Sequence, residues 1–108
     1  MRAAPPAPTP AETASAVMRY AAVLNARVQG RLVVPAEVQM MQLSGATVVA
    51  MQVAPDGRLL GVAVARSSGI PPIDRAALAA VRRTTLPPFT GDMPRHPVTF
   101  DLTVRLKD

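Results

Sequence analysis

Cysteine and tryptophan are absent from this sequence, and aromatic side chains make up only 3% of its 108 residues. Without cysteine the chain cannot hold a disulfide framework, a thiol nucleophile or a cysteine-based zinc site. Because Tyr20, Phe89 and Phe100 are the only aromatics, we expect a core of small aliphatic side chains. The hydrophobic content of 49% is typical of a globular protein, and the length fits one domain.

Long hydrophobic runs are missing as well. No stretch of 18 apolar residues occurs, so the sequence predicts no membrane-spanning helix. The first residues also lack the compact apolar segment and the cleavage site of a secretory signal peptide. The residues given therefore carry neither kind of membrane signal.

The formal net charge of +5 raises the question of nucleic-acid binding. The basic residues are scattered singly, and only Arg82 and Arg83 form a pair. A nucleic-acid interface usually combines a basic stripe with stacking aromatics or a groove-reading helix. Neither pattern is present, so we expect no nucleic-acid partner. A basic surface of this kind is compatible with weak attraction to anionic polymers of the cell wall.

Residues that could suggest catalysis lack the partners that catalysis needs. His96 is the only histidine, and metal sites require several ligands at workable spacing. Ser67 and Ser68 precede Gly69 but do not form a Gly-x-Ser-x-Gly nucleophile motif. The glycines form no phosphate-binding loop. We therefore expect no enzyme, no metal site and no cofactor.

The first twelve residues (1–12) are rich in proline and alanine. Proline removes backbone donors and favours an extended polyproline conformation, so this segment is expected to be a disordered, semi-rigid linker. The remaining residues (13–108) show the periodicities of helices and strands, which predicts one folded domain.

Two helices are predicted before the first strand. Between residues 13 and 32 apolar side chains recur at helical spacing, Thr13 and Ser15 are candidate N-caps, and Gln29 lies away from the apolar stripe. Pro35 ends this helix and can begin a second, short one that runs to about residue 43.

A β-hairpin is predicted next. Residues 46–53 are apolar on both faces, which favours a central strand. Ala54-Pro55-Asp56-Gly57 has the residue types of a tight turn. The returning strand is predicted at residues 58–66.

The last part of the chain predicts a helix and a third strand. The helix covers residues 73–83, with Asp74 as its cap, and a proline-rich loop follows at 86–97. Residues 98–106 then alternate strictly between apolar and polar side chains, which indicates a strand with one buried face.

This order of elements predicts an α+β fold with a three-stranded antiparallel sheet, strand order 2-1-3, and helices packed on one face. The helical crossover returns the third strand beside the first, so the third strand lies at an edge. Such an edge offers unpaired N–H and C=O groups to a partner strand. It could equally be an unused edge protected by the outward charges of Asp101, Arg105 and Lys107.

Five short motifs occur in a fixed order: Val34-Pro35; Gly45, ten residues after the proline; Thr47, Val49, Met51 and Val53 at alternate positions, followed by Asp56-Gly57; Ser67-Ser68-Gly69; and Ile73-Asp74-Arg75-Ala76-Ala77-Leu78. In this order and spacing the sequence resembles the TonB/TolA-type C-terminal domain family, from about residue 20 to residue 106. Three positions depart from the family's pattern. Val34 stands in place of a tyrosine, Val38 in place of a small residue and Met51 in place of an aromatic.

The resemblance implies a periplasmic, non-catalytic module of a TonB-like energy transducer, attached to the inner membrane through an N-terminal helix outside this sequence. In that family the module binds a TonB-box-like segment of an outer-membrane receptor by strand addition, and an ExbB/ExbD-type motor drives it from the proton gradient. Carried over to this chain, the partner-binding residues belong to the stretch before the proline and to the last strand: Arg31, Leu32, Val33, Val34, Val98, Thr99, Phe100, Asp101, Leu102, Thr103, Val104, Arg105 and Leu106.

Three other interpretations remain open on the sequence alone. A TolA-like domain of the Tol-Pal system, which serves envelope integrity, would have a similar fold. A structural module could use the basic surface to bind peptidoglycan. An open edge strand could also pair with a second copy of the chain to form a homodimer.

Overall fold

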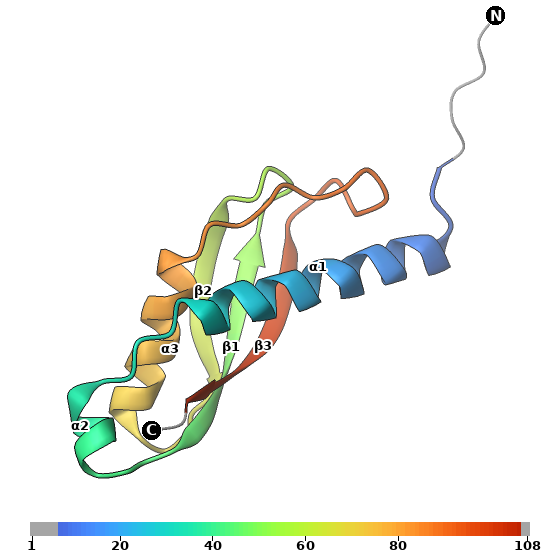
Figure 1. The fold of residues 1–108 in the computed structure, drawn as a ribbon. Coiled ribbons are helices and arrows are strands. Elements are labelled where there is room, and N and C mark those ends of the chain that lie inside the picture. The colour runs from blue at the N-terminus through green and yellow to red at the C-terminus, as the bar shows by residue number, and fades with distance from the viewer. Residues whose placement is uncertain (1–6, 107–108) are drawn as a thin grey trace, which may run out of the picture.

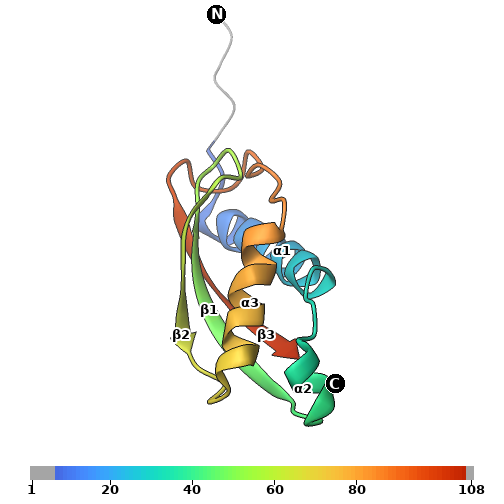
Figure 2. The same ribbon diagram turned by 90° about the vertical axis from the view of Figure 1, so that its left-hand side faces the viewer.

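The structure is a computed structural model that describes residues 7–106. Its elements in chain order are α1 (Pro10–Gly30), α2 (Ala36–Met40), β1 (Gly45–Val53), β2 (Leu59–Arg66), α3 (Pro71–Arg83) and β3 (Val98–Leu106). The sheet has the order β2-β1-β3, and both pairings are antiparallel. The helices lie on one face of the sheet (Figure 1), and Figure 2 shows that the other face is uncovered. The predicted α+β fold and strand order are confirmed. Residues 1–6 of the predicted linker lie outside the described residues.

The first helix begins earlier than predicted. Its N-cap is Thr9, whose hydroxyl oxygen accepts a hydrogen bond from the Glu12 N–H at 3.1 Å. Pro10 occupies the first turn, where the missing N–H costs nothing and the fixed φ suits a helix. The predicted N-caps Thr13 and Ser15 are therefore wrong. The prediction assigned all the prolines of residues 1–12 to a linker, whereas Pro10 begins the helix.

The central position predicted for the first strand is confirmed. β1 pairs with both other strands, and its side chains alternate between the helix-covered face and the uncovered face. Four side chains are fully buried under the helices: Thr47, Val49, Met51 and Val53. The opposite face presents mostly small side chains, which are half-buried or exposed: Ala46, Val48, Ala50 and Gln52. Its apolar content thus marks a central strand without a second buried layer.

The predicted hairpin turn at residues 54–57 joins β1 to β2 and also contacts the loop after α3. Gly57 has φ of 90°, and a Cβ added there would lie 2.7 Å from the Leu86 carbonyl oxygen. The Phe89 N–H donates to the Pro55 carbonyl at 2.8 Å. Only glycine fits both the left-handed conformation and this close approach.

Asp74 lies in the first turn of α3 but does not cap it. The N-cap is Ile70, without a side-chain hydrogen bond, so the predicted capping role is wrong. The Asp74 carboxylate instead accepts hydrogen bonds from the Thr47 hydroxyl at 2.7 Å, from the Ser68 N–H at 2.9 Å and from the hydroxyls of Ser67 and Ser68. Partial burial raises the pKa of this carboxyl, but the hydrogen bonds from Ser67, Ser68 and Thr47 outweigh it and hold the pKa far below its usual range.

Two apolar clusters form the core between helices and sheet. The larger includes the three aromatic rings, with Tyr20 5.0 Å from Phe89 and 5.3 Å from Phe100 between ring centroids. The Tyr20 hydroxyl donates to the Pro87 carbonyl at 2.8 Å, which joins α1 to the loop after α3. The smaller cluster lies near the end of β3 and consists of Val38, Ile73 and Leu106.

Candidate partner-binding edge

The strand predicted to bind a partner, β3, lies at one edge of the sheet. Its register with β1 is uninterrupted, from Gly45 opposite Leu106 to Val53 opposite Val98. Figure 1 shows β1 on one side of β3 only. A strand paired without interruption presents its outer hydrogen-bonding groups in a regular row.

Side chains alternate along β3, which divides the predicted binding residues into two sets. Phe100, Leu102, Val104 and Leu106 are buried beneath the helices, and Val98 is half-buried. The exposed set lies on the uncovered face of the sheet and comprises Thr99, Asp101, Thr103 and Arg105. The side chains of this second set are the ones that a partner could contact.

The outward main-chain groups of β3 are identified by a contact with α1. The Gln29 side chain donates from Nε2 to the Arg105 carbonyl at 3.0 Å and accepts from the Arg105 N–H through Oε1 at 2.7 Å. Arg105 therefore points its main-chain groups away from β1. Because this direction repeats every second residue in an antiparallel strand, those of Thr99, Asp101 and Thr103 also point outward. Within residues 7–106 no hydrogen bond reaches these three residues from that side.

The contact between Gln29 and Arg105 was not predicted from the sequence. Hydrophobic periodicity places Gln29 off the buried stripe of α1, as predicted, and yet its side chain is half-buried against β3. Its partner lies 76 residues away along the chain. Such a pairing leaves no local signal in a sequence.

The predicted stretch Arg31–Val34 meets β3 only at one end. Leu32 and Val34 are half-buried and pack against the smaller core cluster, which contains the last residue of β3. Val33 is 59% exposed and lines a groove of about 290 Å³ between this stretch and α3. Arg31 lies near the end of α3. The structure thus does not place this stretch along the outer edge of β3.

The other edge of the sheet is β2, as the predicted strand order implies, and the sequence assigned no binding role to it. Its pairing with β1 is irregular at two places, between Val48 and Val49 and between Gln52 and Val53. Irregularities of this kind bend a strand and interrupt its row of donors and acceptors. Leu60 and Val64 are exposed there, at 44% and 36%. β3 is therefore the more regular edge for strand pairing.

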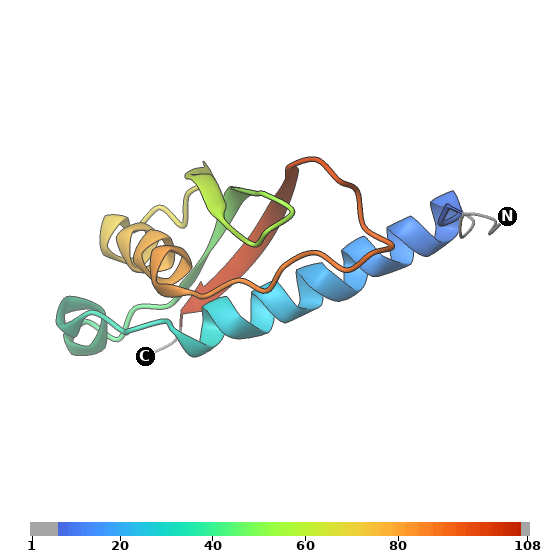
Figure 3. The same ribbon diagram turned by 90° about the horizontal axis from the view of Figure 1, so that it is seen from above.

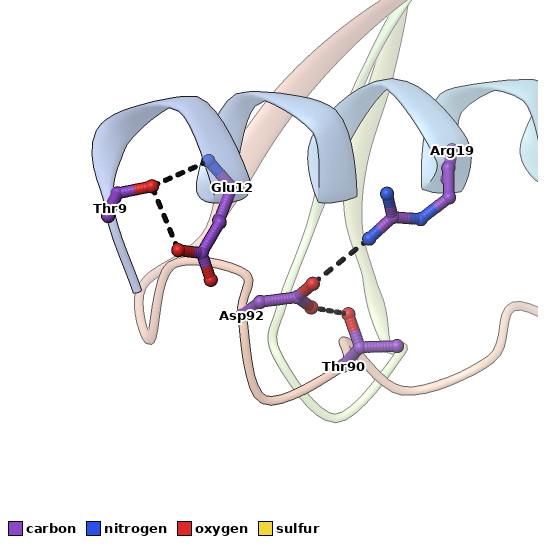
Figure 4. Close-up of polar contacts among 5 residues, drawn as sticks. All are labelled: Thr9, Glu12, Arg19, Thr90 and Asp92. Atoms are coloured by element: carbon purple, nitrogen blue, oxygen red, sulfur yellow. Dashed lines mark hydrogen bonds and ion pairs between the residues drawn. The ribbon is translucent and has the colours of Figure 1, made fainter. Parts of the chain in front are cut away.

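The loop that leads into β3 is fastened to the first half of α1, which Figure 3 shows extending past β3. Arg19 forms an ion pair with Asp92 at 3.0 Å, and the Thr90 hydroxyl donates to the same carboxylate (Figure 4). The hydrogen bond from Thr90 is the main cause that lowers the pKa of Asp92, with a further contribution from Arg19. These contacts position the loop and have no arrangement typical of catalysis.

Neither a metal site nor a membrane-spanning helix is found in the described part of the chain. Among residues 7–106 no three side chains of the histidine, cysteine, aspartate and glutamate types come together as possible metal ligands. No helix in that range combines the length and the apolar character needed to cross a bilayer. His96, the sole histidine, is exposed.

Comparisons with known proteins agree with this geometry. A search of curated proteins found no match. Among solved structures, the NMR solution structure of the Helicobacter pylori TonB-CTD is similar, with a TM-score of 0.71, 16% sequence identity, and coverage of 89% of this chain and 94% of that chain. At this identity the likeness establishes the fold. The family model for the Gram-negative bacterial TonB protein C-terminal matches residues 30–107, which is most of the sequence. The chain therefore belongs to the TonB C-terminal domain family.

Proposed function

We propose that this domain is the periplasmic, partner-binding end of a TonB-type energy transducer and that it acts without catalysis. Family membership supports this assignment, and both comparisons name TonB rather than TolA. The partner is a short extended segment of an outer-membrane receptor. An ExbB/ExbD-type motor in the inner membrane supplies the energy through the part of the protein that anchors it.

The observation that carries the proposal is the regular outer edge of β3. Thr99, Asp101 and Thr103 direct their N–H and C=O groups outward without a partner among the described residues. An extended peptide can satisfy these groups by adding a fourth strand to the sheet. Main-chain pairing places little demand on the peptide's side chains, so one domain can serve several receptors.

The proposal is tested by titrating the isotope-labelled domain with a synthetic peptide that carries the TonB box of an outer-membrane receptor. Amide signals of Val98–Leu106 are expected to shift, with the largest changes at the outward residues. A control peptide with proline at its central position lacks an N–H needed for the ladder and should bind much more weakly. Unchanged β3 signals at millimolar peptide would contradict strand addition.

A further inference from the structure

The Gln29 side chain imitates a neighbouring strand at one position of the β3 edge. A primary amide offers a carbonyl acceptor and an N–H donor, the same pair that a backbone peptide group offers. Both are used on Arg105, at 2.7 and 3.0 Å. The two hydrogen bonds that an added strand would make to Arg105 are thus already made within the domain.

The position of Gln29 is fixed by its own helix. Val28 precedes it and is fully buried, as is Leu24 one turn earlier, so the last turn of α1 is held against the sheet. The residue lies just before the stretch that the family model matches, which begins at residue 30. Gln29 therefore lies outside the matched stretch, whereas its partner Arg105 lies inside it.

The β3 edge is consequently divided into an open and a closed part. The outward groups of Thr99, Asp101 and Thr103 have no partner within residues 7–106, whereas those of Arg105 are bonded to Gln29. From this we infer that Gln29 closes the C-terminal end of the edge and thereby sets the register of the docked strand, which pairs along residues 99–103 and stops before Arg105. This inference rests on the proposed function and specifies which part of β3 the receptor segment uses.

Hydrogen-bond energies favour a docked strand that stops before Arg105 over one that displaces Gln29. A strand that pairs with Thr99, Asp101 and Thr103 exchanges hydrogen bonds to water for hydrogen bonds to protein, with a small net gain for each. A strand that advances to Arg105 must first break two existing bonds and gains only two of the same kind. It must also pass the end of α1, where Leu32 packs near the last residue of β3.

The first part of the test uses the free domain and amide hydrogen exchange. Wild type is compared with Gln29→Ala and with Asn25→Ala, a control one turn earlier on α1 whose side chain is exposed. In wild type the Arg105 amide should exchange at least about tenfold more slowly than the amides of Thr99, Asp101 and Thr103. Gln29→Ala should remove that difference, and Asn25→Ala should preserve it. Equal Arg105 exchange in wild type and Gln29→Ala would overturn the inference.

The second part adds the receptor peptide. In wild type it should protect the amides of Thr99, Asp101 and Thr103 and leave the Gln29 side-chain amide signals in place. In Gln29→Ala protection should extend to Arg105, and a peptide long enough to reach it should bind roughly tenfold more tightly, as expected for two added hydrogen bonds. Gln29→Glu keeps the acceptor but loses the donor, so its affinity should fall between those of the other two proteins.

Two results of the peptide experiment would contradict the register limit in different ways. If the Gln29 amide signals in wild type move to their solvent-exposed positions as the peptide binds, the peptide displaces Gln29 and no limit exists. If the peptide protects no β3 amide in any variant, the receptor proposal fails and the register limit fails with it. The exchange of Arg105 in the free domain still decides in that case whether Gln29 closes the edge.

Discussion

At the Asp74 carboxylate, hydrogen bonds from β1 and from the loop before α3 converge on one side chain. Thr47 donates from the central strand, and Ser67 and Ser68 donate from the residues that follow β2. Thr47 is also the buried polar side chain of β1, with no exposed surface. Because hydrogen bonds to a charged acceptor are stronger than neutral ones, Asp74 holds the start of α3 to β1 and to the residues that follow β2.

Asp74→Asn is expected to lower the free energy of unfolding by about 2 kcal/mol at neutral pH, because an amide turns one donor group toward the hydroxyls and carries no charge. Urea denaturation followed by circular dichroism measures the difference. Asp101→Asn is the matched control, since Asp101 is exposed on the uncovered sheet face. Equal midpoints for the two variants would contradict the role assigned to Asp74.

The same carboxylate predicts a pH dependence with a defined sign. The folded-state pKa of Asp74 is lowered, so its ionisation stabilises the fold above its unfolded pKa of about 4. That stabilisation is lost progressively as the pH falls below about 4 toward the folded value. Unfolding midpoints measured between neutral pH and about pH 2 should therefore fall more steeply for wild type than for Asp74→Asn.

At the scale of elements, the conformation of the β1-β2 hairpin is fixed by its own turn and also by the loop that follows α3. Gly57 has a positive φ and lies against the loop that follows α3. At Gly61, four residues further on in β2, an added Cβ would have no atom of the described residues within 4 Å. The two glycines of this hairpin therefore differ in what they tolerate.

Gly57→Ala is expected to lower the free energy of unfolding by roughly 2–3 kcal/mol, because the Cβ meets backbone at 2.7 Å and the conformation is strained. Gly61→Ala should be neutral or slightly stabilising, since alanine restricts the unfolded chain more than glycine does. Thermal unfolding of both variants gives the comparison. Similar losses of unfolding free energy in the two variants would contradict the prediction, because they would mean that the loop at Leu86 moves to accommodate the new Cβ.

The outer edge of β3 can be blocked without disrupting its inner ladder. Asp101→Pro removes an outward N–H that no described residue uses, and proline is tolerated on strand edges at such positions. We expect this variant to keep its fold, as judged by circular dichroism, and to lose at least about tenfold in affinity for the receptor peptide of the proposed function. Asp101→Ala retains the N–H and should bind within a few-fold of wild type. Full affinity of the proline variant would place the peptide elsewhere on the domain.

For the whole molecule, the features predicted correctly are those that local patterns specify. Alternation along residues 98–106 predicted a strand with one buried face, and the two apolar faces of residues 46–53 predicted a central strand. The hairpin and the helical crossover then gave the strand order. The start of α1 was predicted too late, since a proline next to a linker and a proline in a first turn look alike in sequence. The roles of Asp74 and Gln29 were not predicted, because each depends on partners that only folding brings near.

The candidate site was predicted more coarsely than the fold. The sequence indicated all of β3 and the stretch Arg31–Val34, whereas the structure narrows the accessible positions to alternate residues of the strand. Which N–H groups of a strand face solvent depends on the side on which its neighbour lies and on the face that is buried, and the prediction did not resolve this residue by residue. The predicted order 2-1-3 also placed β2 at an edge, but its irregular pairing with β1 was not predicted.

The regular outer edge of β3 would make the resistance of a bound segment to force depend on the direction of pulling. If a bound segment lies along this strand and is pulled along its own axis, the force loads all of its main-chain hydrogen bonds in shear at the same time. If it is pulled perpendicular to the strand, the hydrogen bonds break one after another, starting from one end. One surface can thus hold firmly under tension in one direction and release readily after a change in angle, without any rearrangement of the fold.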